Sequence, residues 1–372
     1  MNKLIIIGGG FAGLSALNRL KGHPKDLELV LIDKGEKFDF LPLLPDAIGR
    51  EIIVDHLTND LAGFCKSKGV RFINEVVTEI DFGKQEVFMG ARVLNYDYLI
   101  IASGSETNFY SNEALKKQAY KIDDAGDTEL IRSAIKDGHY DTYMISGGGY
   151  TGIEVATNLR VFLNKEGRKG RIVIVERAPS ILGPLPQWMK DYVFENLKEL
   201  QVECFTGVVI EKVEGNKVFL QGGKVFENAM LIWTAGVKTS DFIQRVQAEK
   251  NPQGRIKVDE YLRLNEHCFV VGDAAYVAYG DTFLRMAVQF AIMQGETAAE
   301  NVLNSIRGGH LKKYRPIDLG YIIPMANNRS CGVILGGNIK GFPGILLHYL
   351  MCVYRSCTLR NKWGLIKDLL KA

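Results

Sequence analysis

Cysteine, histidine and long apolar runs are all scarce in this sequence. The 372 residues include six cysteines and six histidines, and neither type recurs at the spacing of a metal site. We therefore expect free thiols in a reducing compartment and no bound metal. No window reaches the roughly 18 consecutive apolar residues of a membrane-spanning helix. The N-terminal apolar stretch runs straight into glycines without a small-residue cleavage site, so we expect no signal peptide.

Charge is nearly balanced overall but unevenly distributed. The formal net charge is +3, yet residues 309–372 hold ten Lys or Arg and only two Asp or Glu. The remainder of the chain holds 36 basic and 41 acidic residues. A basic end on a mildly acidic body favours contact with an anionic surface. Aromatic and basic residues do not interleave as they do in nucleic-acid modules, so we expect no nucleic-acid partner.

Glycine, by contrast, is placed in a specific pattern near the N-terminus. Gly8, Gly10 and Gly13 follow an apolar strand predicted at 3–7 and open a predicted helix. The first glycine permits a tight turn, the second lets the backbone approach a pyrophosphate, and the third lets helix pack on strand. The next predicted strand stops at Asp33, an acid suited to a ribose diol. Strand, turn, helix, strand and acid together predict a dinucleotide site.

The same pattern occurs a second time in the middle of the chain. Gly147, Gly149 and Gly152 lie between a predicted strand and helix, and the next strand stops at Glu176. An acid there would repel a 2′-phosphate, which favours NAD over NADP, although Arg177 directly after it could weaken that preference.

Each copy is followed by a short antiparallel excursion and then a buried strand. Strands and helices that alternate in this way predict an α/β fold with parallel, doubly wound sheets. We predict two Rossmann-type domains, the second inserted into the first, and a C-terminal segment of two strands and two amphipathic helices. The predicted bounds are 1–112 and 256–325 for the first domain, 113–255 for the inserted domain and 326–372 for the C-terminal segment.

The ordered motifs resemble one family of flavoproteins. They are GGGFAGL, FLPLL, VVTEID, GGGYTGIE, LIWTAGV, VVGDAA and QFAIMQGETAAENV, and they cover essentially the whole chain. This order is similar to that of type II NADH dehydrogenase, a single-subunit NADH:quinone oxidoreductase with two dinucleotide-binding domains. The resemblance implies FAD in the N-terminal domain, NAD(H) in the inserted domain, and electron transfer to a membrane quinone without proton pumping.

The resemblance also implies roles for individual residues. Glu154 would lie where nicotinamide meets flavin and guide hydride and proton transfer; alternatively, it is an acid stabilised by the helix dipole. Val77 is explained almost as well as a buried strand residue. The implied FAD contacts are Gly8, Gly10, Phe11, Ala12, Gly13, Asp33, Lys34, Pro42, Val77, Ser103, Gly104, Asp273 and Ala291. The implied NAD(H) contacts are Gly147, Gly149, Tyr150, Thr151, Gly152, Glu176, Ala235 and Gly236.

The electron acceptor depends on a stretch that departs from the family pattern. The family usually has an Ala–Gln pair and a second Gln four residues after the first, whereas this chain has Val288–Gln289 and then Met293. We assign Gln289, Met293 and Gln294 to a predicted quinone site, in which Met293 could line an apolar slot. Two alternatives stay open: a soluble NAD(P)H-dependent reductase of a small electron-carrier protein, and a flavoprotein that senses NAD(H).

Cysteine distinguishes this chain from related enzyme classes. Disulfide reductases need a redox-active pair beside the flavin, and sulfide:quinone reductases need cysteines around the second glycine motif. Between Cys65 and Cys204 the chain has none, which argues against both classes. Cys352 and Cys357 are expected on one helix, where a separation of five residues points them in different directions, so we interpret them as structural thiols.

The C-terminal stretch predicts an interfacial helix. At 100° per residue, Trp363 and the leucines and isoleucine of 362–371 gather on one side and charged residues on the other. Such a helix suits an anionic membrane surface, and we expect a monotopic protein on the cytoplasmic face of the cell membrane. Packing on its own domain or a homodimer interface is the alternative. The sequence leaves open the quinone type, the oligomeric state and the preference for NADH or NADPH.

Overall fold

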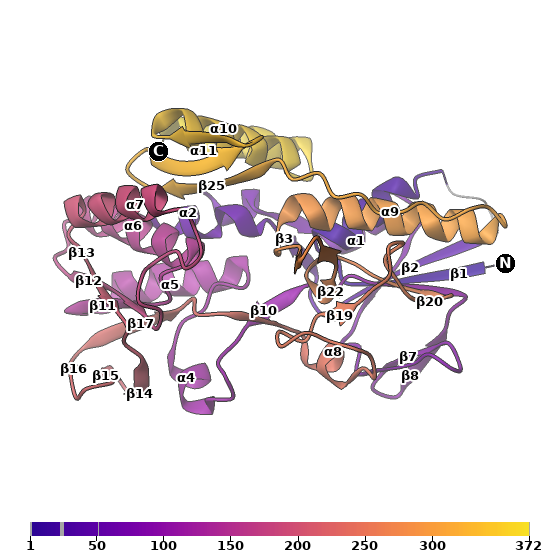
Figure 1. The fold of residues 1–372 in the computed structure, drawn as a ribbon, viewed down its shortest axis with the longest axis horizontal. Helices are drawn as coiled ribbons and strands as arrows, with labels where there is room; N and C mark the ends of the chain where they lie inside the picture. The colour runs from indigo at the N-terminus through magenta and orange to yellow at the C-terminus, as the bar shows by residue number, and fades with distance from the viewer. Residues whose placement is uncertain (1, 23–25, 51, 372) are drawn as a thin grey trace. The chain divides into compact units, whose positions relative to one another are not determined.

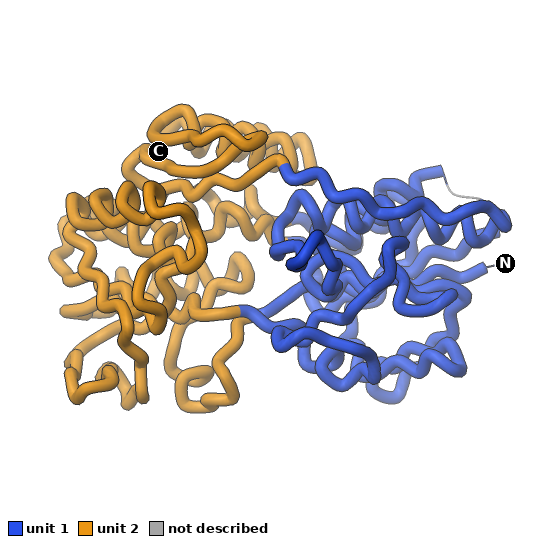
Figure 2. Tube along the Cα trace, viewed as in Figure 1, with its two compact units in different colours: residues 1–38, 59–106, 237–318 blue, residues 39–58, 107–236, 319–372 orange. Residues whose placement is uncertain are grey.

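The computed structural model describes residues 2–22, 26–50 and 52–371. These residues form two compact units, and each unit is assembled from three separate stretches of chain (Figure 2). Unit 1 comprises the chain up to residue 38 together with 59–106 and 237–318; unit 2 comprises 39–58, 107–236 and the chain from 319 onwards.

Unit 1 is built on a six-stranded sheet in the order β20-β21-β9-β1-β2-β5 (Figure 1). Its central strand β1 (Asn2–Ile7) pairs in parallel with β2 (Leu27–Asp33) and β9 (Tyr98–Ile101). Leu4, Ile5 and Ile6 are fully buried, as expected for a parallel strand covered on both faces. Helices α1 (Phe11–Arg19) and α9 (Val288–Ile306) pack against each other. The other elements are α3 (Leu61–Lys66), β5 (Arg71–Asn74), β6 (Glu79–Asp81), β7 (Glu86–Met89), β8 (Arg92–Asn95), α8 (Asp241–Arg245), β19 (Ile256–Lys257), β20 (Arg263–Asn265), β21 (Cys268–Val270), η3 (Gly272–Ala274), β22 (Ala275–Tyr276), β23 (Ala278–Tyr279) and β24 (Thr282–Phe283).

Unit 2 repeats this plan on a four-stranded parallel sheet in the order β13-β12-β11-β17. Strand β11 (Thr142–Ser146) takes the central place of β1, and β12 (Arg171–Glu176) and β17 (Ala229–Trp233) take the places of β2 and β9. A three-stranded antiparallel meander follows in both units, β6-β7-β8 in one and β14-β15-β16 in the other. The predicted duplication of an α/β unit is therefore confirmed. The other elements of this repeat are α4 (Glu113–Gln118), α5 (Ala125–Asp137), α6 (Tyr150–Lys165), α7 (Gln187–Glu199), β13 (Val202–Thr206), β14 (Ile210–Glu214), β15 (Lys217–Leu220) and β16 (Val225–Phe226).

Unit 2 also contains an early segment and the end of the chain. The early segment comprises η1 (Leu41–Leu43), α2 (Leu44–Gly49) and η2 (Val54–His56). The last part holds three strands rather than the two predicted, because the short polar β27 (Gly337–Lys340) pairs with β26 (Arg329–Ile334). Strand β25 (Gly320–Met325) completes that sheet, and α10 (Phe342–Arg355) and α11 (Leu359–Lys371) follow. Ile48, Ile323 and Cys331 are part of the buried core of this unit.

Four short strands lie where the chain passes from one unit to the other. They are β3 (Lys37–Asp39), β4 (Thr58–Asp60), β10 (Ser105–Thr107) and β18 (Val237–Thr239). The units are defined by spatial contacts and not by the nucleotide that each would bind, so the predicted domain bounds remain a prediction. Within the described parts of the chain, no helix is both long and apolar enough to span a bilayer.

Candidate functional site

The first glycine turn connects β1 to α1 and leaves a helix N-terminus open. Gly8 has a φ of +108°, and a Cβ atom there would lie 2.3 Å from the carbonyl oxygen of Ala102. A Cβ at Gly13 would lie 1.9 Å from the Gly8 carbonyl oxygen, so only glycine lets α1 approach β1 this closely. Gly10 caps α1 without a side-chain hydrogen bond, and a Cβ there would meet open space. The N–H groups of the first helical turn are thus available to an anion such as a pyrophosphate.

The second glycine turn has the same construction. Gly147 has a φ of +106°, and a Cβ at Gly152 would lie 1.9 Å from the Gly147 carbonyl oxygen. Gly149 caps α6 without a side-chain hydrogen bond and also faces open space. Both turns therefore have the open, positively polarised N-terminus that a dinucleotide phosphate requires.

The two acids predicted to bind ribose also brace the turns, a role that the sequence pattern did not reveal. One carboxylate oxygen of Asp33 accepts a hydrogen bond from the Gly9 amide at 2.6 Å, and the other accepts one from an amide two residues farther along at 2.7 Å. Glu176 repeats this with Gly148 at 2.6 Å and with the amide two residues farther along at 2.7 Å. Each acid thereby fixes the middle of its glycine turn.

A cavity of about 340 Å³ adjoins the first turn within unit 1. The hydroxyl oxygens of Ser103 and Ser240 are buried and have no hydrogen-bond partner among the described residues, and both residues line the cavity. Unpaired buried hydroxyls are costly unless a ligand pairs with them, so this lining fits the polar groups of a nucleotide. Five predicted FAD contacts lie together here: Gly8, Asp33, Lys34, Val77 and Ser103.

The Asp273 turn η3 is held beside α1 by helix α9. Asp273 accepts a hydrogen bond from the Ser105 hydroxyl at 2.8 Å; burial raises the pKa of Asp273, while that bond and the charge of Arg255 oppose the rise. The side-chain oxygen of Gln294 accepts a hydrogen bond from the Gly272 amide at 2.7 Å. A Cβ at Gly272 would lie 3.8 Å from the Cβ of Ala291. The structure therefore brings Ala291 and Asp273 to one region of unit 1.

The three predicted quinone contacts do not all lie on one side of α9. Gln294 is 1% exposed and serves the Gly272 turn, whereas Gln289 donates a hydrogen bond to Asp318 at 3.0 Å. Met293 lines an open groove of about 670 Å³ together with Arg19, Glu296, Glu300, Lys312 and Arg315. Gln289 and Met293 are four positions apart and share one face of α9, whereas Gln294 points to another side of the helix. Their role toward quinone stays a prediction.

Glu154 lies in the second turn of α6, and its side chain is partly exposed. Burial of its carboxyl group raises its pKa well above the usual value, and the negative charge of Asp46 adds to that rise. Asp46 belongs to α2, which packs closely on α6, since a Cβ at Gly49 would lie 2.2 Å from the Asn158 carbonyl oxygen. Burial and a neighbouring acid thus both favour the protonated form of Glu154.

The remaining predicted cofactor contacts lie around the same two turns or in short loops. In unit 1, Phe11 meets Phe38 edge-on at 5.1 Å, and Gly104 follows Ser103 with a φ of +66°. In unit 2, Tyr150 stacks on Tyr321 at 5.8 Å. Three further predicted contacts belong to unit 2: Pro42 in η1, Thr151 in the first turn of α6, and Ala235, whose Cα would lie 3.1 Å from a Cβ at Gly147. Gly236, with a φ of +90°, follows Ala235.

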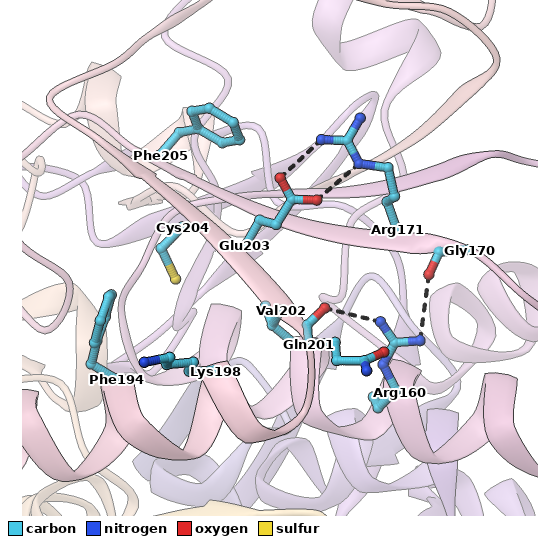
Figure 3. A pocket seen from close by; sticks show the side chains of 10 residues that line it. All are labelled: Arg160, Gly170, Arg171, Phe194, Lys198, Gln201, Val202, Glu203, Cys204 and Phe205. Atoms are coloured by element: carbon cyan, nitrogen blue, oxygen red, sulfur yellow. Dashed lines mark hydrogen bonds and ion pairs between the residues drawn. The ribbon is translucent and has the colours of Figure 1, made fainter.

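A groove of about 600 Å³ lies at the edge of the unit 2 sheet, along β13 and α7 (Figure 3). The Arg160 guanidinium donates hydrogen bonds to the carbonyl oxygens of Leu200, Gly170 and Gln201. Arg171 forms two hydrogen bonds with Glu203, at 2.8 and 2.9 Å. These cations are satisfied by the protein itself, and no predicted site residue lines the groove.

The six cysteines are free. Cys352 is buried in α10, whereas Cys357 lies between α10 and α11, so the prediction that both belong to one helix is wrong. Burial raises the pKa of the Cys352 thiol, which keeps it protonated. Among the residues whose positions are described, no three His, Cys, Asp or Glu side chains gather closely enough to hold a metal ion.

Comparisons with known proteins agree with this arrangement. A family model described as pyridine nucleotide-disulphide oxidoreductase matches residues 2–299. The demethylphylloquinone reductase NdbB of Synechocystis sp. is 26% identical over 97% of this chain and 93% of the relative. A type II NADH:quinone oxidoreductase of Staphylococcus haemolyticus is 25% identical over 91% of each chain. The structure of NDH2 from Plasmodium falciparum in complex with NADH has a TM-score of 0.87 at 18% identity and covers 100% of this chain and 98% of that chain. The chain thus belongs to the pyridine nucleotide-disulphide oxidoreductase family.

Proposed function

We propose that this protein oxidises NADH and transfers the electrons to a quinone, with FAD held by the first glycine turn and NADH by the second. The observation that carries the proposal is the pair of open helix N-termini at Gly10 and Gly149, each braced by an acid. Support for quinone as the acceptor comes from the names of relatives that match this chain over nearly its full length.

FAD would supply the redox chemistry, by taking a hydride from NADH and passing two electrons onward. The residues of unit 1 would bind and orient it: the first turn of α1 suits its pyrophosphate, the cavity beside Asp33 suits its adenosine, and Asp273 suits its remaining hydroxyl or phosphate groups.

Reduction of the quinone needs one proton more than NADH supplies as hydride. A hydride carries two electrons and one proton, whereas reduction of a quinone takes two electrons and two protons. Glu154, whose pKa is raised by burial and by the negative charge of Asp46, is suited to hold the second proton. No part of this scheme moves protons across a membrane.

We also propose that unit 2 binds the cytoplasmic face of a membrane through its last two helices. Along α10, Phe342, Leu346, Leu350 and Tyr354 follow one another at every fourth residue, and each is at least half exposed. In α11 two apolar side chains, Trp363 and Leu370, are 63% and 83% exposed, whereas Leu365 is fully buried and holds the helix to its unit. A helix that turns its apolar side outward suits a lipid interface.

The catalytic proposal is tested by a panel of acceptors. Purified protein should show flavin absorbance that NADH bleaches, and NADH oxidation should be fastest with menaquinone or ubiquinone analogues. Faster turnover with a ferredoxin-type acceptor would indicate that the natural electron acceptor is a carrier protein and not a quinone. Slow turnover with every acceptor would indicate an NAD(H) sensor, and the absence of flavin would refute the proposal.

The membrane proposal is tested with vesicles rich in phosphatidylglycerol. The double variant Trp363→Ser, Leu370→Ser should bind about tenfold more weakly or worse, because two exposed apolar side chains lose their burial in lipid. The control is Leu130→Ser, Phe194→Ser, which removes two exposed apolar side chains, 62% and 51% exposed, from α5 and α7. An equal loss of vesicle binding in both double variants would contradict the proposal. A homodimer that dissociates in the first variant, without vesicle binding by the parent, would assign the surface to self-association.

A further inference from the structure

Two tyrosines from distant parts of the chain stack on each other at the N-terminus of α6. Tyr150 is the first residue of α6, and Tyr321 belongs to β25. Their ring centroids are 5.8 Å apart, and the ring planes differ by 28°. Both residues belong to unit 2. Stacked rings at this separation attract each other beyond the burial of their surface, so each ring restricts the positions that the other can take.

The side chain of Tyr150 lies beside the second glycine turn. It follows Gly149, which caps α6 without a side-chain hydrogen bond, and the Cα–Cβ bonds of a helix tilt toward its N-terminus. The Tyr150 ring therefore borders the space in front of the first helical turn, whose N–H groups suit a pyrophosphate. Tyr150 is 37% exposed despite its contact with Tyr321, so part of its surface is available to a ligand.

The place of Tyr150 on α6 indicates which half of the nucleotide it would contact. Glu176, at the end of β12, suits the ribose of the adenosine half. Tyr150 precedes Glu154 by four residues, so both lie on one face of α6 and Tyr150 is one turn nearer the N-terminus. The proposed function uses Glu154 for the proton of the reaction, and the assignment of Tyr150 to the nicotinamide half rests on it.

Tyr321 is the more firmly held of the two rings. In β25 it pairs with Val333 of β26, and its hydroxyl donates to the sulfur of Met189 in α7 at 3.7 Å. Met189 is fully buried, and Tyr321 and Val333 both pack against the buried core of unit 2. A strand, a helix and the core thus fix Tyr321, which in turn orients Tyr150.

Tyr321 lies outside the stretch that carries the dinucleotide fingerprints. The family model matches residues 2–299, whereas β25 belongs to the last part of the chain. That part therefore supports the second glycine turn in addition to providing the two helices proposed to bind a membrane.

We propose that Tyr321 is a positioning residue for NADH: it holds the Tyr150 ring beside the open N-terminus of α6 before the nucleotide arrives. A side chain that the ligand itself must immobilise weakens binding, because its loss of freedom opposes association. The contact with Tyr321 removes most of that penalty in advance. Loss of Tyr321 should therefore weaken nucleotide binding, whereas the reaction of a bound nucleotide should change little.

The test measures NAD+ binding to the full-length, flavin-loaded protein by calorimetry, which requires no electron acceptor. In Tyr321→Leu the dissociation constant should rise about three- to tenfold, the penalty for ordering one side chain. Tyr321→Phe keeps the stacked ring and should bind like the parent protein. In turnover, Tyr321→Leu should raise the KM for NADH by a similar factor, with little change in kcat or in the KM for quinone.

A double variant separates positioning from a general loosening of unit 2. If Tyr321 acts through Tyr150, the variant Tyr150→Leu, Tyr321→Leu should bind NAD+ no more weakly than Tyr150→Leu alone. The matched control is Tyr192→Leu, which removes another partly buried tyrosine that packs against the same core. This control should leave the dissociation constant unchanged.

The outcomes distinguish this inference from the proposed function. Unchanged affinity in Tyr321→Leu, equal weakening in Tyr192→Leu, or fully additive losses in the double variant would each overturn the inference alone. If the parent protein binds NAD+ and the variants behave as expected, but no quinone accepts electrons, the proposed function fails and the inference stands. A parent protein that binds no NAD+ would overturn both.

Discussion

The two glycine turns of this protein can be compared residue by residue. Gly8 and Gly147 differ by 2° in φ, and the carboxylates of Asp33 and Glu176 bind the next glycine's amide at the same distance of 2.6 Å. Their surroundings differ. A Cβ at Gly8 would lie 2.3 Å from the carbonyl oxygen of Ala102, whereas the nearest atom to a Cβ at Gly147 would be the Cα of Ala235, at 3.1 Å.

The first turn also has supports for which we identify no equivalents in the described parts of unit 2. A cavity lined by two residues with unpaired hydroxyl groups adjoins it, and Gln294 accepts a hydrogen bond from the Gly272 amide beside Asp273. In unit 2, Tyr150 and Thr151 at the start of α6 are exposed. The difference teaches that one fingerprint can serve a resident cofactor or an exchanging one, depending on what encloses it.

The largest effect is expected from the glycines that touch a carbonyl oxygen. Gly13→Ala and Gly152→Ala each place a methyl group 1.9 Å from that oxygen, which should lower the free energy of unfolding by roughly 1–3 kcal/mol. Gly13→Ala should be purified without flavin, whereas Gly152→Ala should keep its flavin and lose NADH binding. Absorbance spectra and NADH titrations check this, and flavin loss in both variants would show that the turns are not independent.

Replacing the glycines that face open space should affect cofactor binding without affecting stability. A Cβ at Gly10 or Gly149 has no protein atom within 4 Å, so Gly10→Ala and Gly149→Ala should leave thermal stability nearly unchanged. The methyl group would instead obstruct the approach of a pyrophosphate. Weaker flavin retention in Gly10→Ala and a higher KM for NADH in Gly149→Ala are expected; unaltered binding in both would argue against phosphate at these turns.

The bracing acids should give smaller and matched effects. Asp33→Asn and Glu176→Gln each set an amide NH2 against a backbone N–H group, which should cost about 1–3 kcal/mol of stability. Glu176→Gln should also raise the relative use of NADPH, on the order of tenfold, because the charge that repels a 2′-phosphate is gone. Denaturant unfolding and kcat/KM for both nucleotides measure the two effects, and an unchanged nucleotide preference would assign Glu176 to bracing alone.

The smallest effect is expected from replacing Gln294, whose side chain supports only the first turn. Gln294→Leu removes the acceptor for the Gly272 amide, at a cost of about 1 kcal/mol or more. Flavin should dissociate faster on dilution while the affinity for NADH stays the same. If quinone kinetics alone changed, the residue would act at the acceptor site as the sequence suggested.

The sequence predicted the structure well at positions where the backbone conformation allows only one type of residue. The φ values of Gly8 and Gly147 allow few alternatives to glycine, so both turns and the strands around them were predicted nearly to the residue. The acids were also found, because they follow a buried strand. Bracing by Asp33 depends on where its oxygens lie, and spacing carries no such information.

Helix α9 and the hydrogen bond between Tyr349 and Asp46 show what the sequence could not predict. Gln289, Met293 and Gln294 are neighbours in sequence, but the helix turns Gln294 away from the face that the other two share, toward the Gly272 amide. Asp46 and Tyr349 are 303 residues apart in the chain, and no local sequence pattern indicates that they form a hydrogen bond. Long-range polar contacts of this kind come only from the packed structure.

The polar side of α11 determines how strongly the protein's orientation would be fixed at a membrane. Asp368 accepts hydrogen bonds from His56 and the Ile53 amide, and Asn361 donates to the carbonyl oxygens of His56 and Thr58. The helix is therefore fastened to its unit and is not a flexible tether. Lipid that takes up Trp363 and Leu370 would hold the tilt and height of the whole unit, so diffusion would be confined to a plane with one face of the unit always turned to the bilayer.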